Sequence, residues 1–235
     1  MSSARVLRAP IAPIAPIGVV ALVVALVVAL VAVACAKPPA PLAAPDPARL
    51  SARGPDSFTV RVVTSRGAFE LRAHRDWAPR GADRLYYLAH AHYFDSVRFF
   101  RVVDKFVAQF GLNGDTAVSR AWRDRRIDDD SVVRSNVRGT LTYAAGGKNT
   151  RTVQLFINYK DNSRLDTLGF AVVAQVVSGM DVVDALYQGY GEGPPRGKGP
   201  DQARIAREGN AYLRKEFPRL DFIITARVGE EWRTR

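Results

Sequence analysis

The sequence predicts a mostly-β domain, an antiparallel barrel or sandwich with helices covering its ends. Short runs rich in β-branched and aromatic residues recur along the chain, separated by turns that contain glycine. Two or three helical segments lie among them without the regular strand-helix alternation of a parallel sheet. With 235 residues, 47% of them hydrophobic, the chain has enough apolar material for one sizeable core.

Residues 1–35 form a separate N-terminal zone. Two arginines precede an uncharged, mostly aliphatic run over 9–34, which ends before Cys35, the only cysteine. This pattern is typical of an export signal or a membrane anchor. About 20 apolar residues suffice to span a bilayer, whereas three prolines shorten the continuous helix and favour cleavage after Ala34. Residues 32–35 resemble a bacterial lipobox, in which the cysteine becomes the lipidated first residue.

Both alternatives, a cleaved lipoprotein leader and an uncleaved helical anchor, place the body outside the cytoplasm, in the cell envelope and attached to the membrane. One cysteine allows no internal disulfide. Residues 36–57 are rich in Pro and Ala and predict an extended tether. The folded body is then expected over 58–229, with a C-terminal tail over 230–235.

The first half of the body predicts two strand pairs around a helix. Runs over 58–63 and 68–71 flank a glycine-containing turn and form a hairpin. Apolar residues then recur every three or four positions over 82–93, which indicates one face of a helix. Runs over 98–103 and 106–110 are the next two strands.

The second half begins with a long polar excursion over 111–138, in which the acidic run 128–130 is most simply a solvated loop. The stretch over 189–200 is almost all Gly, Pro and charged residues. The remaining elements are strands over 139–144, 152–158, 170–177 and 221–228 and helices over 180–187 and 204–216.

Composition and motif spacing exclude several function classes. The net charge of +11 favours weak association with anionic surfaces, but no nucleic-acid-binding motif accompanies it. His90 and His92 lie two positions apart on a helix and point to different sides, so no metal site is expected. Phosphate-loop and serine-nucleophile motifs are absent, and no cofactor is expected. What remains is an enzyme that stabilises a conformational transition state, or a binding protein.

Three stretches, FFRVVDKFVAQFGLNGD, GTLTYAAGGKNTRTVQLFIN and LDTLGFAVVAQVVSGMDVVDAL, begin at Phe99, Gly139 and Leu165. Together they resemble the cyclophilins, the cyclosporin-binding peptidyl-prolyl cis-trans isomerases. The cyclophilin pattern runs F-H-R, P-G-F-M-x-Q, then G-x-L-x-M-A and Q-F-F-I, then L-D, and its order and spacing agree over 58–228. The resemblance implies a closed eight-stranded antiparallel barrel with a helix at each end, to which this chain adds the insertion over 190–220.

The resemblance also implies a set of site residues. Arg101 matches the arginine of F-H-R and would donate to the prolyl nitrogen while the X-Pro amide is twisted, and Gln109 would orient it. Both are expected to be catalytic. The residues expected to bind the substrate are Phe100, Phe106, Val107, Ala144, Ala145, Gln154, Phe156, Leu165 and Phe170.

Several positions depart from the family pattern. Phe100 replaces the histidine of F-H-R, Ala145 replaces an asparagine, and Arg164 replaces the tryptophan that contacts cyclosporin. We expect a monomeric prolyl isomerase that acts on proline-containing peptides or unfolded exported proteins and has poor affinity for cyclosporin. The alternatives are a proline-peptide binding module with little turnover and a structural envelope lipoprotein.

Overall fold

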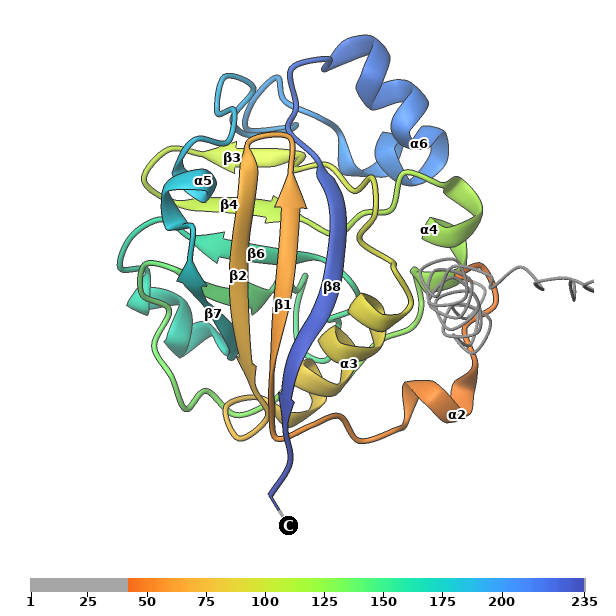
Figure 1. Cartoon of the computed structure of the whole chain (residues 1–235). Coiled ribbons are helices and arrows are strands. Elements are labelled where there is room, and N and C mark those ends of the chain that lie inside the picture. The colour runs from red at the N-terminus through yellow and green to blue at the C-terminus, as the bar shows by residue number, and fades with distance from the viewer. Residues whose placement is uncertain (1–41, 235) are drawn as a thin grey trace, which may run out of the picture. The chain divides into compact units, whose positions relative to one another are not determined.

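Eight strands form one sheet in the computed structural model, which describes residues 42–234 (Figure 1). Across the sheet their order is β3-β4-β6-β5-β7-β2-β1-β8, and every ladder is antiparallel. The prediction of a mostly-β fold with eight antiparallel strands is confirmed. The strands are β1 (Ser57–Thr64), β2 (Gly67–His74), β3 (Arg101–Val103), β4 (Val107–Phe110), β5 (Thr140–Tyr143), β6 (Leu155–Asn158), β7 (Val172–Ser178) and β8 (Ile223–Trp232).

The prediction that the sheet closes into a barrel is wrong. Strands β3 and β8 are its two edges, and no ladder joins them. The chain makes a single isolated bridge between Arg98 and Phe222, before either strand begins. β3 has only three residues, and its outer edge is bridged by the insertion instead, through Val102 and Gly191. The edge of β3 is thus met by Gly191 of the insertion and not by β8.

The core lies inside the strongly curved sheet. Figure 1 shows β1, β2 and β8 side by side in front of β3, β4 and β6, which run across them. Alternate residues of the strands point inward, such as Phe58 and Val60 of β1 and Phe69 and Leu71 of β2, all 2% exposed or less. Residues of β4 and β6 that point away from this core lie on the outer face of the sheet.

Helices cover the sheet and the insertion. α3 (Pro79–His90) packs against β2, β7 and β8, whereas α6 (Gln202–Glu216) packs against α4 (Thr116–Trp122). The helices predicted from periodicity are present. α4 and the 3₁₀ helix η1 (Ser163–Leu168) lie in segments for which no helix was expected. The other helices are α2 (Pro47–Leu50) and α5 (Met180–Asp184).

The segment that precedes β1 contacts the folded body. The indole Nε1 of Trp122 donates to the carbonyl of Leu42 at 2.9 Å, and the amide of Gly54 donates to Asp83 Oδ1 at 2.9 Å. Cys35 and the apolar leader lie outside the described residues. Within residues 42–234, the helices are all too short or too polar to cross a membrane.

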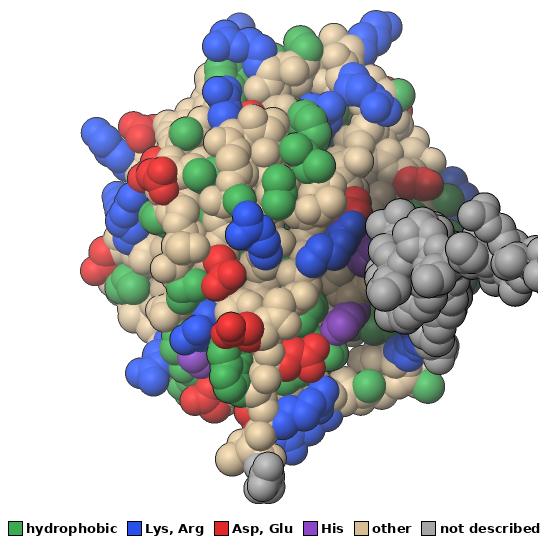
Figure 2. Space-filling view, in the orientation of Figure 1, with side chains coloured by type: hydrophobic (Ala, Val, Ile, Leu, Met, Phe, Trp, Pro, Cys, Tyr) green, Lys and Arg blue, Asp and Glu red, His purple; other side chains and the backbone are tan. Residues whose placement is uncertain are grey.

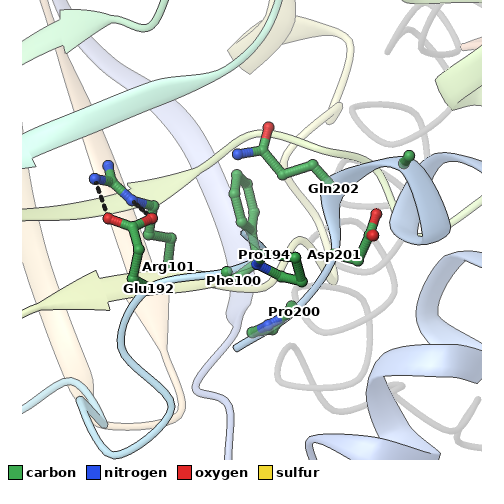
Figure 3. A pocket seen from close by; sticks show the side chains of 9 residues that line it. Phe100, Arg101, Glu192, Pro194, Pro200, Asp201 and Gln202 are labelled. Atoms are coloured by element: carbon green, nitrogen blue, oxygen red, sulfur yellow. Dashed lines mark hydrogen bonds and ion pairs between the residues drawn. The ribbon is translucent and has the colours of Figure 1, made fainter. Parts of the chain in front are cut away.

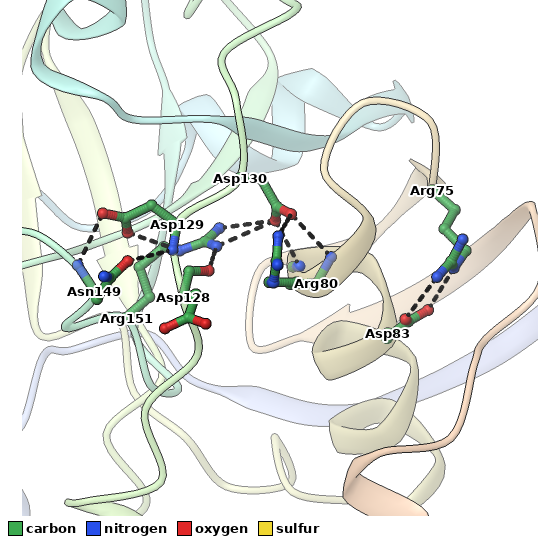
Figure 4. A network of polar contacts seen from close by, with 9 residues as sticks. Arg75, Arg80, Asp83, Asp128, Asp129, Asp130, Asn149 and Arg151 are labelled. Atoms are coloured by element: carbon green, nitrogen blue, oxygen red, sulfur yellow. Dashed lines mark hydrogen bonds and ion pairs between the residues drawn. The ribbon is translucent and has the colours of Figure 1, made fainter.

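The acidic run 128–130 is not a fully solvated loop, as its sequence predicted. Asp128 is exposed, but the side chain of Asp130 is only 1% exposed and accepts from the buried Arg151 at 3.1 Å (Figure 4). Asp130 also accepts from the backbone amides of Arg80 and Gly81 in the first turn of α3. Backbone donors and a buried guanidinium make this burial favourable, since each compensates for lost hydration.

Basic side chains are spread over the surface. On the face drawn in Figure 2, Lys and Arg lie around the molecule with Asp and Glu between them. On this face the excess of positive charge therefore forms no single basic patch.

Gly209 interrupts α6 with φ of 60° and ψ of −149°. A Cβ at this position would lie 2.2 Å from the carbonyl oxygen of Gly114, which accepts from the amide of Asn210. We expect Gly209→Ala to lower the free energy of unfolding by about 2 kcal/mol, measured by chemical denaturation. Gly146→Ala is the control, because a Cβ at that position would have no atom within 4 Å, and unchanged stability of Gly209→Ala would contradict the prediction.

Candidate active site

Strand alternation brings Arg101 and Gln109 to one face of the sheet. They are paired in the register of β3 and β4, while the adjacent Val102 and Ala108 point into the core. Nη1 of Arg101 donates to Oε1 of Gln109 at 3.0 Å, and Nε2 of Gln109 donates to Oε1 of Gln154 at 2.9 Å. The three side chains form a polar chain along this face.

An apolar group lies on the same outer face, separate from the main core. We call it the apolar slot. Two of its rings, those of Phe156 and Phe170, meet edge to face with centroids 5.9 Å apart. The slot consists of the buried residues Val107, Phe156 and Leu165 and the half-buried residues Phe106, Ala144 and Phe170.

The short helix η1 brings Leu165 into the slot. The amide of Leu165 donates to the carbonyl of Asn162 at 2.8 Å, and Nδ2 of Asn162 donates to the carbonyl of Phe106 at 3.0 Å. Asp166 accepts from the backbone and side chain of Asn136 at 2.9 and 2.7 Å. These bonds hold η1 against β4 and fix one wall of the slot.

Arg101 lies beside the slot and is paired with an acidic residue of the insertion. Its Cζ lies 5.4 Å from the centroid of the Phe106 ring. Nε and Nη2 of Arg101 donate to the two carboxylate oxygens of Glu192 at 2.6 and 2.8 Å, and Figure 3 shows the two groups facing each other. Sequence reasoning missed Glu192. Its one signal was that it is the only acidic residue between Gly189 and Pro200.

Three of the expected substrate-binding residues are not part of the slot: Gln154, which belongs to the polar chain, and Phe100 and Ala145. Phe100 is 1% exposed and packs in a second cluster with Ile205, Leu213 and other residues of α6 and the segment that follows it. It also lines a cavity of about 220 Å³ together with Arg101 and Glu192 (Figure 3). Ala145 lines a different cavity of about 590 Å³, which reaches Phe170. The structure brings the remaining residues of the expected site together in the polar chain and the slot.

The ion pair sets the protonation of Glu192. Hydrogen bonds from Arg101 hold the pKa of this carboxyl below its ordinary value of 4.5. The pair therefore contributes its full stability above pH 4.5 and loses it as the pH falls through the lowered folded pKa. We expect the ¹³C signal of the carboxyl to be constant between pH 5 and 8 and to titrate only below 4.5. Titration above 4.5 would contradict the pairing.

No cluster of three or more His, Cys, Asp or Glu residues that could hold a metal ion occurs in the part of the chain that the structure describes. The groups that the site offers are a fixed cation, two amides and an apolar slot. Such a site suits the binding and distortion of a peptide.

These features define an open antiparallel β-sheet domain with an arginine beside an apolar slot on its outer face. Comparison with known proteins identifies the family. The family model described as cyclophilin type peptidyl-prolyl cis-trans isomerase/CLD matches residues 59–207, more than half of the chain. The chain belongs to this family. The predicted resemblance is confirmed, and so is the prediction of a peptidyl-prolyl isomerase, at the level of the family.

The relatives include two bacterial proteins. Peptidyl-prolyl cis-trans isomerase A of Dickeya dadantii is 31% identical over 138 residues, which cover 56% of this chain and 72% of that protein. A peptidyl-prolyl cis-trans isomerase of Acinetobacter baylyi is 29% identical over 142 residues, with coverages of 58% and 76%.

Among solved structures, a cyclophilin-type isomerase of Cryptosporidium parvum shares the fold. It superposes with a TM-score of 0.55 at 17% identity, covering 74% of this chain and 99% of that one. A second crystal structure of that protein, obtained in the presence of the dipeptide Ala-Pro, gives a TM-score of 0.54. At this identity the likeness concerns the fold alone.

Proposed function

We propose that this chain is a membrane-anchored prolyl isomerase of the cell envelope that assists the folding of exported proteins. The observation that carries the catalytic part is the position of Arg101, which is hydrogen-bonded to Gln109 and lies 5.4 Å from the ring of Phe106 in the apolar slot. The leader over 1–35 supports the envelope location, and Cys35 is the proposed site of lipidation.

In this proposal the apolar slot holds the proline ring of the substrate. Rotation about an X-Pro bond crosses a barrier of about 18–20 kcal/mol in conjugated amides. Rotation frees the lone pair of the prolyl nitrogen, and a donor aimed at that atom stabilises the twisted amide more than the planar one. Arg101 supplies the donor, because its guanidinium stays protonated. Gln109, itself bonded to Gln154, holds the guanidinium, and the slot excludes water from the bond that rotates.

The catalytic part is tested with the full-length chain in mild detergent and the peptide Ala-Ala-Pro-Phe para-nitroanilide, of which chymotrypsin cleaves the trans form. Acceleration of the slow cis phase in proportion to the concentration of the chain supports an isomerase. Binding of the peptide without acceleration would instead support a proline-peptide binding module.

The anchor is tested separately in a bacterial host. Incorporation of a fatty-acid probe that is lost in Cys35→Ala supports a lipoprotein. Retention of the chain in the membrane fraction without labelling would support the uncleaved helix, and recovery of the chain from the cytoplasm would contradict the envelope location.

A further inference from the structure

Glu192, which comes from the insertion, holds the side chain that the proposed mechanism depends on. We propose that Glu192 is a positioning residue for the isomerase reaction: its carboxylate fixes the orientation of the Arg101 guanidinium, which in turn acts on the substrate. This inference rests on the function proposed above and assigns a catalytic purpose to the insertion.

The hydrogen bonds leave part of the guanidinium free while fixing its plane. A guanidinium has five N–H donors. Glu192 takes one from Nε and one from Nη2, and Gln109 takes one from Nη1. Among the described residues, one N–H on each terminal nitrogen is left for a substrate. A bidentate pair with a carboxylate has a defined geometry, so rotation of the Arg101 group would break bonds to both partners.

Glu192 is itself held in place from two sides. The preceding Gly191 bridges to Val102 of β3, and the carbonyl of Glu192 accepts from the amide of Gly199 at 2.9 Å. The ring of Tyr190 meets that of Phe217, which follows α6, with centroids 5.0 Å apart. The acidic side chain is therefore presented by a braced segment of backbone.

The buried side chain of Phe100 links α6 of the insertion to the residue next to Arg101. Phe100 directly precedes Arg101 and is packed with Ile205, Tyr212 and Leu213 of α6. The same two positions of the chain thus bind the insertion twice, through an apolar contact at Phe100 and an ion pair at Arg101.

The carboxylate also offsets a repulsion within the site. Cζ of Arg164 lies 5.1 Å from the centroid of the Phe106 ring, and Cζ of Arg101 lies 5.4 Å from the same centroid. Two like charges beside one ring repel each other. Without the charge of Glu192, Arg101 would lose one of its two acceptor oxygens there and the repulsion would no longer be offset, so its guanidinium would sample other orientations.

The test compares Glu192→Gln with Glu208→Gln in the full-length chain. Glu208 makes a similar bidentate pair with Arg204 at 2.9 and 3.0 Å, in the same insertion but on the surface of α6. We expect Glu192→Gln to lower kcat for the proline peptide by about 10- to 100-fold with little change in KM, because positioning acts in the transition state. Glu208→Gln should keep both values, and Glu192→Asp, which retains the carboxylate, should recover part of kcat.

A second measurement reports on the bidentate contact between Glu192 and Arg101 independently of turnover. In chain labelled with ¹⁵N-arginine, exchange of the Arg101 Nε proton with solvent should be at least about tenfold faster in Glu192→Gln, since a charge-assisted hydrogen bond is lost. Arg101 signals should not change in Glu208→Gln.

The outcomes separate the inference from the function on which it rests. A wild-type chain without turnover would overturn the proposed function. An active wild type whose kcat is unchanged or higher in Glu192→Gln would overturn the inference alone, and a higher value would show that Glu192 inhibits Arg101. If exchange of the Arg101 Nε proton is unchanged in Glu192→Gln, Glu192 does not fix the guanidinium, whatever the activity.

Discussion

Replacing Arg101 by alanine is expected to lower kcat/KM for a proline peptide by about 100- to 1,000-fold, the usual effect of removing one donor that stabilises a transition state. Arg101→Lys should also be strongly impaired. Lysine keeps the charge but lacks the planar fork that binds Glu192 and Gln109 together. The protease-coupled assay measures both variants.

The control for Arg101 is Arg61→Ala, which removes an exposed arginine from β1. It should keep wild-type turnover. Peptide affinity provides the second readout: Arg101→Ala should still bind a proline peptide, because the apolar slot is intact. Turnover by Arg101→Ala close to that of the wild type would show that the barrier is lowered by other groups.

The strands could be predicted from the sequence because each carries its own signal. A short apolar run bounded by turn residues is a local signal, and such runs placed all eight strands. Closure is not a local property, since it depends on which segment reaches the free edge of β3. That segment contains Gly191, 89 positions along the chain from its partner Val102, in a stretch without strand pattern. α4 was missed because it has only seven residues, although Asp115 caps it by accepting from Ala117 and Val118.

The site could be predicted where a motif covers it. Arg101, Gln109, Gln154 and the slot residues were found through the family pattern, and the structure brings them together. Glu192 lies in the insertion, for which the pattern has no counterpart, so its contact with Arg101 followed from no spacing. Phe100 shows the same dependence, because its burial is explained only by α6.

The buried pair of Asp130 and Arg151 is expected to matter most for stability. Their side chains are 1% and 2% exposed, and Nη1 of Arg151 donates to Asp130 Oδ2 at 3.1 Å. Arg151 also lies 3.3 Å from Asp129 and donates to the carbonyl of Asp128. Figure 4 shows these groups converging on one guanidinium.

Asp130 has a second role at the start of α3. The N-cap residue, Ala78, has no side chain that could accept from the first turn. Asp130 accepts instead from the amides of Arg80 at 3.1 Å and Gly81 at 2.9 Å. A carboxylate here also interacts favourably with the positive end of the helix dipole.

We therefore expect Asp130→Ala to lower the free energy of unfolding by about 3–5 kcal/mol, because it leaves the Arg151 charge buried and α3 without its cap. Urea denaturation followed by circular dichroism measures the change. Asp130→Asn keeps one acceptor and should cost less. The control is Asp124→Ala, whose side chain is 75% exposed and lies 3.6 Å from Arg123, and a change within about 0.5 kcal/mol is expected there.

The loss of unfolding free energy in Asp130→Ala shows whether Arg151 stays dry or becomes hydrated when its partner is removed. A loss below about 1 kcal/mol, as for a surface ion pair, would mean that water reaches Arg151 once its partner is gone. A loss of the expected size would mean that the loop between β5 and β6 is held to α3 through this charge. Since Ala144 and Ala145 begin that loop, Asp130→Ala should then also raise KM for the proline peptide while kcat, which depends on Arg101, changes little.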